Sequence, residues 1–219
     1  HERPDLPVYH PDVVAYEVRE ADGEGIGYFL FDFFMRASKR GGAWMSTFRD
    51  QSGMDGHVCP VVVNCCNFPK SVPCLLGMDE VRTLFHEFGH GLHGLLSDVR
   101  YENLSGTSVK QDFVELPSQI MEHWAVEPEV LKSYARHIDS GDPMPDELIS
   151  RLRDAATFNQ GFETTEYLAA CYLDLAWHGD EADAVEDVAV FEDRAMQQIE
   201  KIGIIDPRYK SSYFQHIFT

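Results

Sequence analysis

Residues 78–96 read MDEVRTLFHEFGHGLHGLL, and their apolar side chains recur at spacings of three and four positions. This periodicity predicts an amphipathic α-helix. Gly77 is the expected N-cap, and Asp79 and Glu80 place negative charge in the first turn, where the helix dipole favours it. The expected helix separates a β-rich part of the chain from a helical part.

Five consecutive residues of this helix, His86-Glu87-Phe88-Gly89-His90, match the pattern H-E-x-x-H. Because residues four apart lie one turn above each other, both imidazoles can bind a single cation. Glu87 is turned about 100° from His86 around the helix axis, so its carboxylate is expected beside the ion, as a base rather than a ligand. Two partly exposed helix histidines without a metal are the alternative interpretation at this point.

A third ligand is not expected from the same helix. His93 lies nearly two turns from His86, about 10 Å along the axis. The metzincin pattern is excluded as well, because it requires glycine at position 93 and histidine at position 96, where this chain has His93 and Leu96. A carboxylate from the next helical segment is the remaining option. Glu115 is the first candidate, and Glu122 competes with it.

Two histidines and one glutamate form a known catalytic zinc set that leaves a fourth position for water. We therefore expect one Zn²⁺ per chain, although these ligand types also suit cobalt or manganese. Zinc would lower the pKa of its water to about 7 and polarise the scissile carbonyl, while Glu87 would take the proton and pass it to the leaving amine. His93, Asp112, Ser118 and Glu122 are candidates to orient the ligands through hydrogen bonds.

The order of the expected elements indicates an α+β fold that is predominantly helical. β-rich runs at 13–18 and 27–34 flank a turn and predict a hairpin, and the β-branched run 58–66 predicts a third strand. Residues 39–56 form a polar, glycine-containing stretch between them. A loop is expected at 97–111.

Helical patterns account for most of the chain after residue 96. They cover residues 113–124, 128–138, 145–158, 164–177 and 184–202. We therefore expect a small N-terminal β-sheet followed by the H-E-x-x-H helix and a helical bundle, as in a zincin-like catalytic core. Residues 1–76 would form the β-rich part, and residues 77–219 the helical metal-binding part, of one catalytic domain.

The composition excludes some classes of partner. The 219 residues include 37 acidic and 18 basic side chains, for a formal net charge of −19, so attraction to nucleic acid or to an anionic membrane is unfavourable. No apolar run approaches the ~20 residues of a membrane helix, and no signal peptide pattern is visible. Five cysteines without a Cys-x-x-Cys pair favour reduced thiols and a cytoplasmic location. Because the chain lacks an initiator methionine, we expect it to be part of a longer protein.

Several motifs resemble those of the thimet oligopeptidase family, peptidase family M3. They are LFHEFGHGLH at 84–93, LSGT at 104–107 and DFVELPSQ at 112–119. Within that family the chain is most similar to the bacterial dipeptidyl carboxypeptidase branch, at IMEHW (120–124), FNQGF (158–162) and SYFQHIF (212–218). The resemblance implies a largely helical, two-lobed enzyme whose deep channel admits short peptides and excludes folded proteins.

The resemblance also implies roles for individual residues. His86, His90 and Glu115 would bind the metal, Glu87 would be the base, and His216 would contact substrate near the metal. The family's N-terminal helical lobe and the tyrosine-bearing loop that follows His216 are missing from this sequence. The rest of a full-length protein is therefore an expected partner of this segment.

The predicted function is zinc-dependent hydrolysis of short peptides with release of C-terminal dipeptides. Gly106 and Thr107, in the expected loop, are candidate substrate contacts. Two alternatives stay open: an oligopeptidase of the same family that cleaves internally, and a noncatalytic fragment that binds zinc or peptide.

Overall fold

The computed structural model describes residues 1–179, 185–197 and 209–218, without the side chains of residues 215 and 216. The chain divides into two compact units, residues 1–146 and 147–219. The first unit contains the β-sheet and the helix with the H-E-x-x-H residues, whereas the described part of the second is helical. No helix in the described part is long and apolar enough to cross a membrane.

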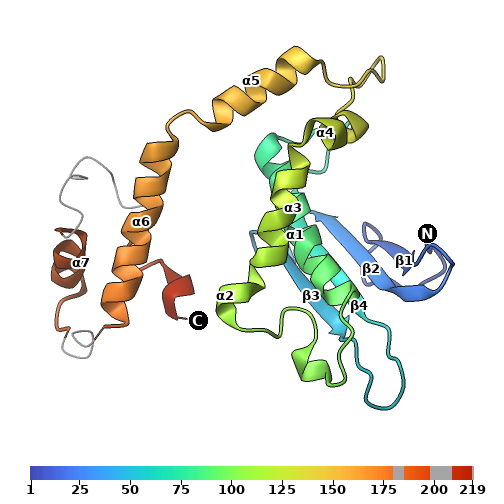
Figure 1. Ribbon diagram of the computed structural model, residues 1–219, viewed down its shortest axis with the longest axis horizontal. Helices are drawn as coiled ribbons and strands as arrows, with labels where there is room; N and C mark the ends of the chain where they lie inside the picture. The colour runs from blue at the N-terminus through green and yellow to red at the C-terminus, as the bar shows by residue number, and fades with distance from the viewer. Residues whose placement is uncertain (180–184, 198–208, 219) are drawn as a thin grey trace. The chain divides into compact units, whose positions relative to one another are not determined.

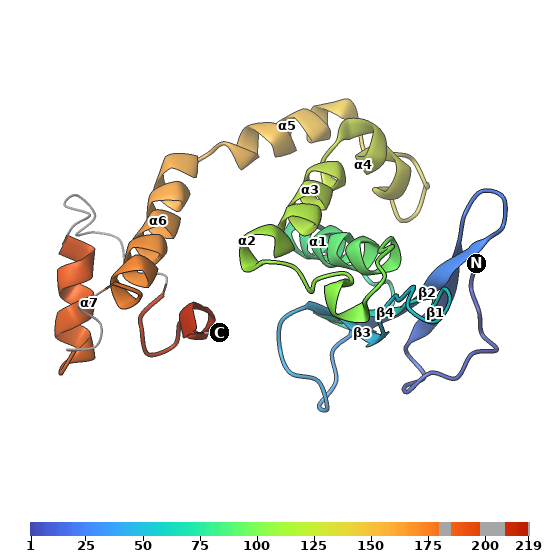
Figure 2. The same ribbon diagram turned by 60° about the horizontal axis from the view of Figure 1, so that its bottom comes forward.

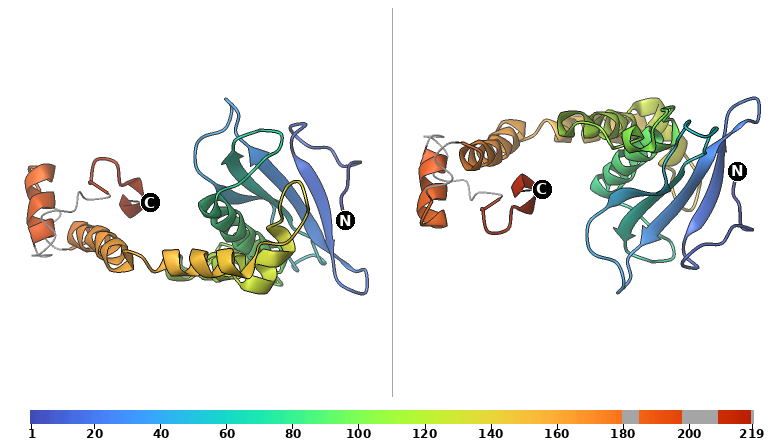
Figure 3. Two further views of the ribbon diagram at one scale, coloured as in Figure 1. Left: turned by 90° about the horizontal axis from the view of Figure 1, so that it is seen from above. Right: turned by 90° about the horizontal axis from the view of Figure 1, so that it is seen from below.

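The first unit contains a four-stranded mixed sheet. Its strands are β1 (Val14–Arg19), β2 (Gly25–Phe34), β3 (Trp44–Arg49) and β4 (Val61–Phe68). They lie in the order β1-β2-β4-β3 (Figure 3). β1 and β2 form the predicted antiparallel hairpin, β2 pairs with β4 in parallel, and β3 pairs with β4 antiparallel. A small sheet followed by helices confirms the α+β fold class.

The prediction of three strands is wrong, because β3 lies within residues 39–56, which were expected to form only a polar stretch. The strand reads WMSTFR and contains β-favouring Trp, Thr and Phe, but glycine and charged residues flank this short run. β3 is an edge strand that pairs with β4 alone. Met45 packs there against a buried cluster that includes Phe29, Val62 and Leu95. The strand therefore depends on tertiary pairing and packing.

A buried charge cluster anchors the connection between β2 and β3. Asp32 is fully buried and accepts two hydrogen bonds of 2.6 Å from Arg36 and one of 2.9 Å from the Tyr9 hydroxyl. Lys39 Nζ lies 3.2 Å from Asp32 Oδ1 and also donates to the carbonyl oxygen of Cys66 on β4. Burial alone would raise the pKa of Asp32, but these hydrogen bonds outweigh it and lower that pKa to about 2. The cluster holds the segment that precedes β3 against the sheet.

One helix covers the sheet, and a second packs on that helix. The helices of the first unit are α1 (Met78–Leu95), the 3-10 helix η1 (Glu102–Leu104), α2 (Gln111–Val114), α3 (Leu116–Ala125) and α4 (Pro128–Tyr134). α1 lies on the sheet, and α3 runs alongside α1 (Figures 1 and 2). Gly77 is the N-cap of α1 as predicted, and its N–H donates to the Glu80 carboxylate at 2.7 Å.

The helical pattern expected at 113–124 is divided into two helices. α2 ends at Val114, and α3 begins at Leu116 with Pro117 in its first turn. Proline is well tolerated there, because the first N–H groups of a helix have no partner within the helix. Glu115 therefore lies at the junction of the two helices, with φ of −84° and ψ of −6°.

α1 approaches the sheet closely because two of its residues there are glycines. A Cβ on Gly91 would lie 2.7 Å from Cε2 of Phe29, and a Cβ on Gly94 would lie 3.1 Å from Cγ2 of Val62. Phe29 is only 2% exposed and Val62 is fully buried, so neither side chain has free space into which to move. The absence of side chains at these two positions sets the separation of helix and sheet.

The described part of the second unit contains three α-helices and a short 3-10 helix. They are α5 (Asp146–Ala156), α6 (Gln160–Trp177), α7 (Val188–Gln197) and η3 (Gln215–Phe218). The three α-helices coincide with the patterns expected at 145–158, 164–177 and 184–202, although residues 184 and 198–202 lie outside the described residues. α6 packs on α7 through the rings of Trp177 and Phe191, whose centroids are 4.4 Å apart.

We expect Gly91→Ala to reduce the free energy of unfolding by up to about 2 kcal/mol. Overpacking against Phe29 costs about 1–3 kcal/mol, and the better helix propensity of alanine returns about 1 kcal/mol. Gly41→Ala is the control, because a Cβ at Gly41 has no atom within 4 Å, and we expect it to change stability by less than about 0.5 kcal/mol. Urea unfolding followed by circular dichroism measures both. A Gly91→Ala variant that is about 1 kcal/mol more stable than the wild type, as helix propensity alone would make it, would contradict the close packing of α1 on the sheet.

Candidate metal centre

Three side chains from two helices converge beside α1. His86 and His90 project from the same face of α1, and Glu115 enters from the junction of α2 and α3. Glu115 Oε2 lies 3.1 Å from His86 Nε2 and 3.2 Å from His90 Nε2. The two imidazole rings are nearly perpendicular, at 83°, with centroids 4.9 Å apart. Among the described residues, these three form the one group of histidine, cysteine or acidic side chains placed to hold a metal ion.

The approach of α3 to α1 depends on Gly89. A Cβ at this position would lie 2.5 Å from the Cα of Ser118 and 2.6 Å from the carbonyl oxygen of Pro117. Both neighbours are backbone atoms, which cannot rotate away as a flexible side chain can. Only glycine therefore permits the helix contact that brings Glu115 next to the two histidines.

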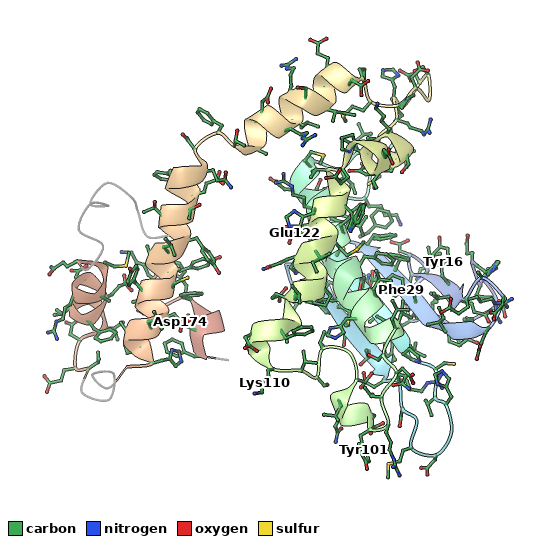
Figure 4. The ribbon with its side chains drawn as sticks, viewed as in Figure 1. Tyr16, Phe29, Tyr101, Lys110, Glu122 and Asp174 are labelled. Atoms are coloured by element: carbon green, nitrogen blue, oxygen red, sulfur yellow. The ribbon has the colours of Figure 1, made fainter. Side chains whose placement is uncertain are left out.

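Hydrogen bonds orient two members of this group. Ser118 is fully buried, and its hydroxyl lies 2.7 Å from Glu115 Oε2 and 2.9 Å from the Glu115 carbonyl oxygen. Glu122, which is labelled in Figure 4 on α3, places Oε1 2.7 Å from Nδ1 of His86. A carboxylate that accepts the Nδ1 proton leaves the Nε2 lone pair of His86 available to a cation. The structure thus brings Ser118 and Glu122, two of the predicted orienting residues, to the candidate ligands.

Glu87 lies next to this group but is more deeply buried. It is 6% exposed, and its Oε2 has no hydrogen-bond partner among the described residues. Burial raises the pKa of Glu87, the nearby Glu115 raises it further, and His86 opposes the shift. A carboxylate with a raised pKa is a stronger base than an exposed one, so Glu87 is well suited to accept a proton.

His90 is also buried, and burial lowers its pKa. The neutral imidazole is therefore favoured, which is the form that binds metal ions. Two imidazole nitrogens and one carboxylate oxygen, all within 4.8 Å of one another, fit the ligand set of a catalytic zinc ion with an open coordination position. The described residues thus satisfy the donor chemistry of the expected cofactor.

The other predicted site residues lie in different surroundings. The ring of His93 packs against Phe113, with centroids 6.1 Å apart, and its Nδ1 has no hydrogen-bond partner among the described residues. Asp112 is exposed, without a hydrogen bond or ion pair to any described residue. These two side chains are therefore not held at the candidate ligands by hydrogen bonds.

The predicted substrate contacts stay untested. The N–H of Gly106, whose φ is +54°, donates to Ser97 Oγ at 2.7 Å, and Thr107 beside it is exposed. His216 lies in η3 of the second unit, and its side chain is outside the described residues. A role for any of them in binding peptide remains a prediction.

A cavity of about 290 Å³ opens beside His86 and Glu87. Its lining comes from α1, α3 and the segment before β3, and consists of Ala43, Arg82, Thr83, His86, Glu87 and Glu122. Arg82 is absent from the predicted site residues. The available signal was its position four residues before His86, which places both on one face of the helix.

The sequence is similar to known peptidases over its whole length. All 219 residues match the model of Peptidase family M3. The chain is 51% identical over 222 residues to a dipeptidyl carboxypeptidase of Salmonella typhimurium and to one of Escherichia coli, and 38% identical over 224 residues to oligopeptidase A of Escherichia coli. These alignments cover 99–100% of the chain but 32% of each relative. The chain therefore spans about a third of the length of the relatives it matches.

We expect Glu122→Ala to weaken zinc binding by about 10- to 100-fold, because the hydrogen bond that orients His86 is lost. Glu129→Ala removes the same charge from an exposed position on α4 and should leave the affinity within about twofold. Competition with a chromophoric chelator measures both affinities. Equal zinc affinity in the two variants would show that the contact between Glu122 and His86 does not support a metal.

Proposed function

Because the chain belongs to peptidase family M3, we propose that it forms the metal-binding part of a zinc-dependent peptidase that acts on short peptides. The observation that supports this most strongly is the convergence of His86, His90 and Glu115 beside the buried carboxylate of Glu87. The packing of α1 on the mixed sheet is consistent with a zincin-like catalytic core.

His86, His90 and Glu115 would hold one zinc ion per chain. A bound zinc ion would act as a Lewis acid toward the scissile carbonyl and would make an attacking water more acidic. Ser118 and Glu122 would keep Glu115 and His86 in the orientation that binding requires, through the hydrogen bonds described above.

Glu87 would move the proton during hydrolysis. Its buried carboxylate accepts a proton from the attacking water and then donates it to the amine nitrogen of the departing peptide. The raised pKa supports both steps, because it strengthens the base and allows the protonated form to persist until the amine leaves. No covalent bond between the chain and its substrate is needed.

The relatives support a proposal for the substrate class. The 51% identity to dipeptidyl carboxypeptidases favours release of C-terminal dipeptides, and the 38% identity to oligopeptidase A keeps internal cleavage as the second candidate. His216, Gly106 and Thr107 are proposed substrate contacts. Since the chain spans a third of these relatives, we propose that regions outside it complete the substrate channel. We also propose a cytoplasmic location.

We expect Glu87→Gln to keep about one zinc per chain but to slow hydrolysis of a quenched fluorescent oligopeptide by about 10²- to 10⁴-fold, because the base is lost. His86→Ala should lose both zinc and activity. Elemental analysis and initial rates, measured on the protein that carries this chain, give the two readouts, and Glu129→Gln is the control for charge. Hydrolysis by Glu87→Gln at the rate of the wild type would contradict the proposed mechanism.

Peptides that differ only in their C-terminus separate exopeptidase from endopeptidase activity. A dipeptidyl carboxypeptidase should cleave a peptide with a free C-terminal carboxylate at least about tenfold more efficiently than its C-terminal amide, since a lost charged hydrogen bond costs about 1.5–3 kcal/mol. Mass spectrometry should then identify a dipeptide product. Equal rates on both peptides, with cleavage at internal bonds, would favour the oligopeptidase alternative.

A further inference from the structure

The cavity beside His86 contains a cationic side chain that the mechanism does not use. Arg82 projects from α1 one turn before His86, is half-buried, and lines this cavity. It has no hydrogen bond or ion pair with any described residue. A guanidinium group has five N–H donors and no acceptor. Arg82 is therefore a cation without an anionic partner, held at the rim of the candidate site.

The acidic groups that share the cavity do not neutralise Arg82. Glu122 Oε1 is engaged with His86 Nδ1 at 2.7 Å, and Glu87 is buried beneath the candidate ligands. Among the described residues, neither carboxylate forms an ion pair with Arg82, so neither lies within 4 Å of the guanidinium nitrogens. The guanidinium of Arg82 is thus available to bind an anion that enters the cavity.

We propose that Arg82 binds the C-terminal carboxylate of the peptide substrate and thereby selects the bond to be cleaved. This inference rests on the proposed function. The guanidinium plane matches a carboxylate with two parallel hydrogen bonds, which a lysine cannot reproduce. A fixed carboxylate partner near the metal centre places the scissile bond at a set number of residues from the C-terminus.

The distances support a short C-terminal product. Arg82 and His86 are four positions apart, which corresponds to about 6 Å along the helix axis. Two extended residues span about 7 Å. A peptide whose scissile carbonyl lies level with His86 and which runs toward the N-terminal end of α1 therefore reaches Arg82 with its terminal carboxylate after about two residues.

Electrostatics gives Arg82 a second effect. Glu115 is one of the candidate ligands, Glu87 and Glu122 lie beside them, and the whole chain carries a net charge of −19. This field repels an anionic peptide terminus. Arg82 is the one arginine or lysine among the residues that line the cavity, so its removal should disfavour a free carboxylate far more than an amide.

Peptide binding to the zinc-loaded Glu87→Gln protein tests the proposal without turnover. The ligands are an N-acetylated pentapeptide with a free C-terminus and the same peptide as its C-terminal amide, and calorimetry measures both affinities. We expect Arg82→Gln to weaken binding of the free acid by about tenfold or more, while binding of the amide changes by less than twofold. Arg82→Lys should keep part of the preference, because it retains the charge but not the planar fork.

Arg100→Gln is the matched control. It removes the same charge from an exposed position after the C-terminal end of α1, and it should leave the preference for the free acid intact. Circular dichroism and zinc content confirm that each variant is folded and loaded.

Three results would overturn the assignment. Arg82→Gln could weaken binding of the free-acid peptide and of the amide peptide equally, which would indicate a structural role. It could leave both affinities unchanged. It could weaken binding only of peptides with a glutamate side chain and not of the same peptides with glutamine in its place. That result would show that Arg82 binds a substrate side chain and not the C-terminal carboxylate. Absence of hydrolysis by the wild type would refute the proposed function but would leave this binding result standing.

Discussion

The contact between α1 and α3 at Gly89 is the constraint on which the candidate site depends. The backbone of Pro117 and Ser118 occupies the space that a side chain at Gly89 would need. This contact brings the junction of α2 and α3 against α1, and Glu115 lies at that junction. A helix break and a glycine, separated by 26 positions in the sequence, thus place one carboxylate oxygen within 3.2 Å of two imidazole nitrogens.

α1 packs closely against a neighbour on two sides, and glycine residues lie at both contacts. Gly89 faces α3, whereas Gly91 and Gly94 face the sheet. Glycine weakens an isolated helix by about 1 kcal/mol per residue relative to alanine, so a helix with three of them needs compensation from packing. The two layers supply it, since α1 contacts β2, β3, β4 and α3 (Figure 2). The functional helix is therefore stable only within its tertiary setting.

The sequence predicted those features that local periodicity and spacing encode. The hairpin, the position and N-cap of α1, and the shared face of His86 and His90 follow from patterns within a few residues. Glu115 was reached by chemical reasoning about a third ligand and by family resemblance. β3 was missed because it needs β4 as a partner, and Arg82 was missed because its free state becomes visible only when the neighbouring helices are placed. Long-range pairing decides β3, and the one local signal for Arg82 is its position on the face of α1 that also carries His86.

The sheet contributes to the chemistry as well as to the fold. Cys66 on β4 is fully buried, and burial, aided by the charge of Glu87, raises the pKa of its thiol to about 12. The thiol therefore stays neutral near pH 7 and adds no negative charge beside Glu87. Burial of Glu87 on α1 likewise raises the pKa of its carboxyl group, because a buried carboxylate is poorly solvated, and this makes it a stronger base. Burial therefore remains the largest cause of the raised pKa of Glu87.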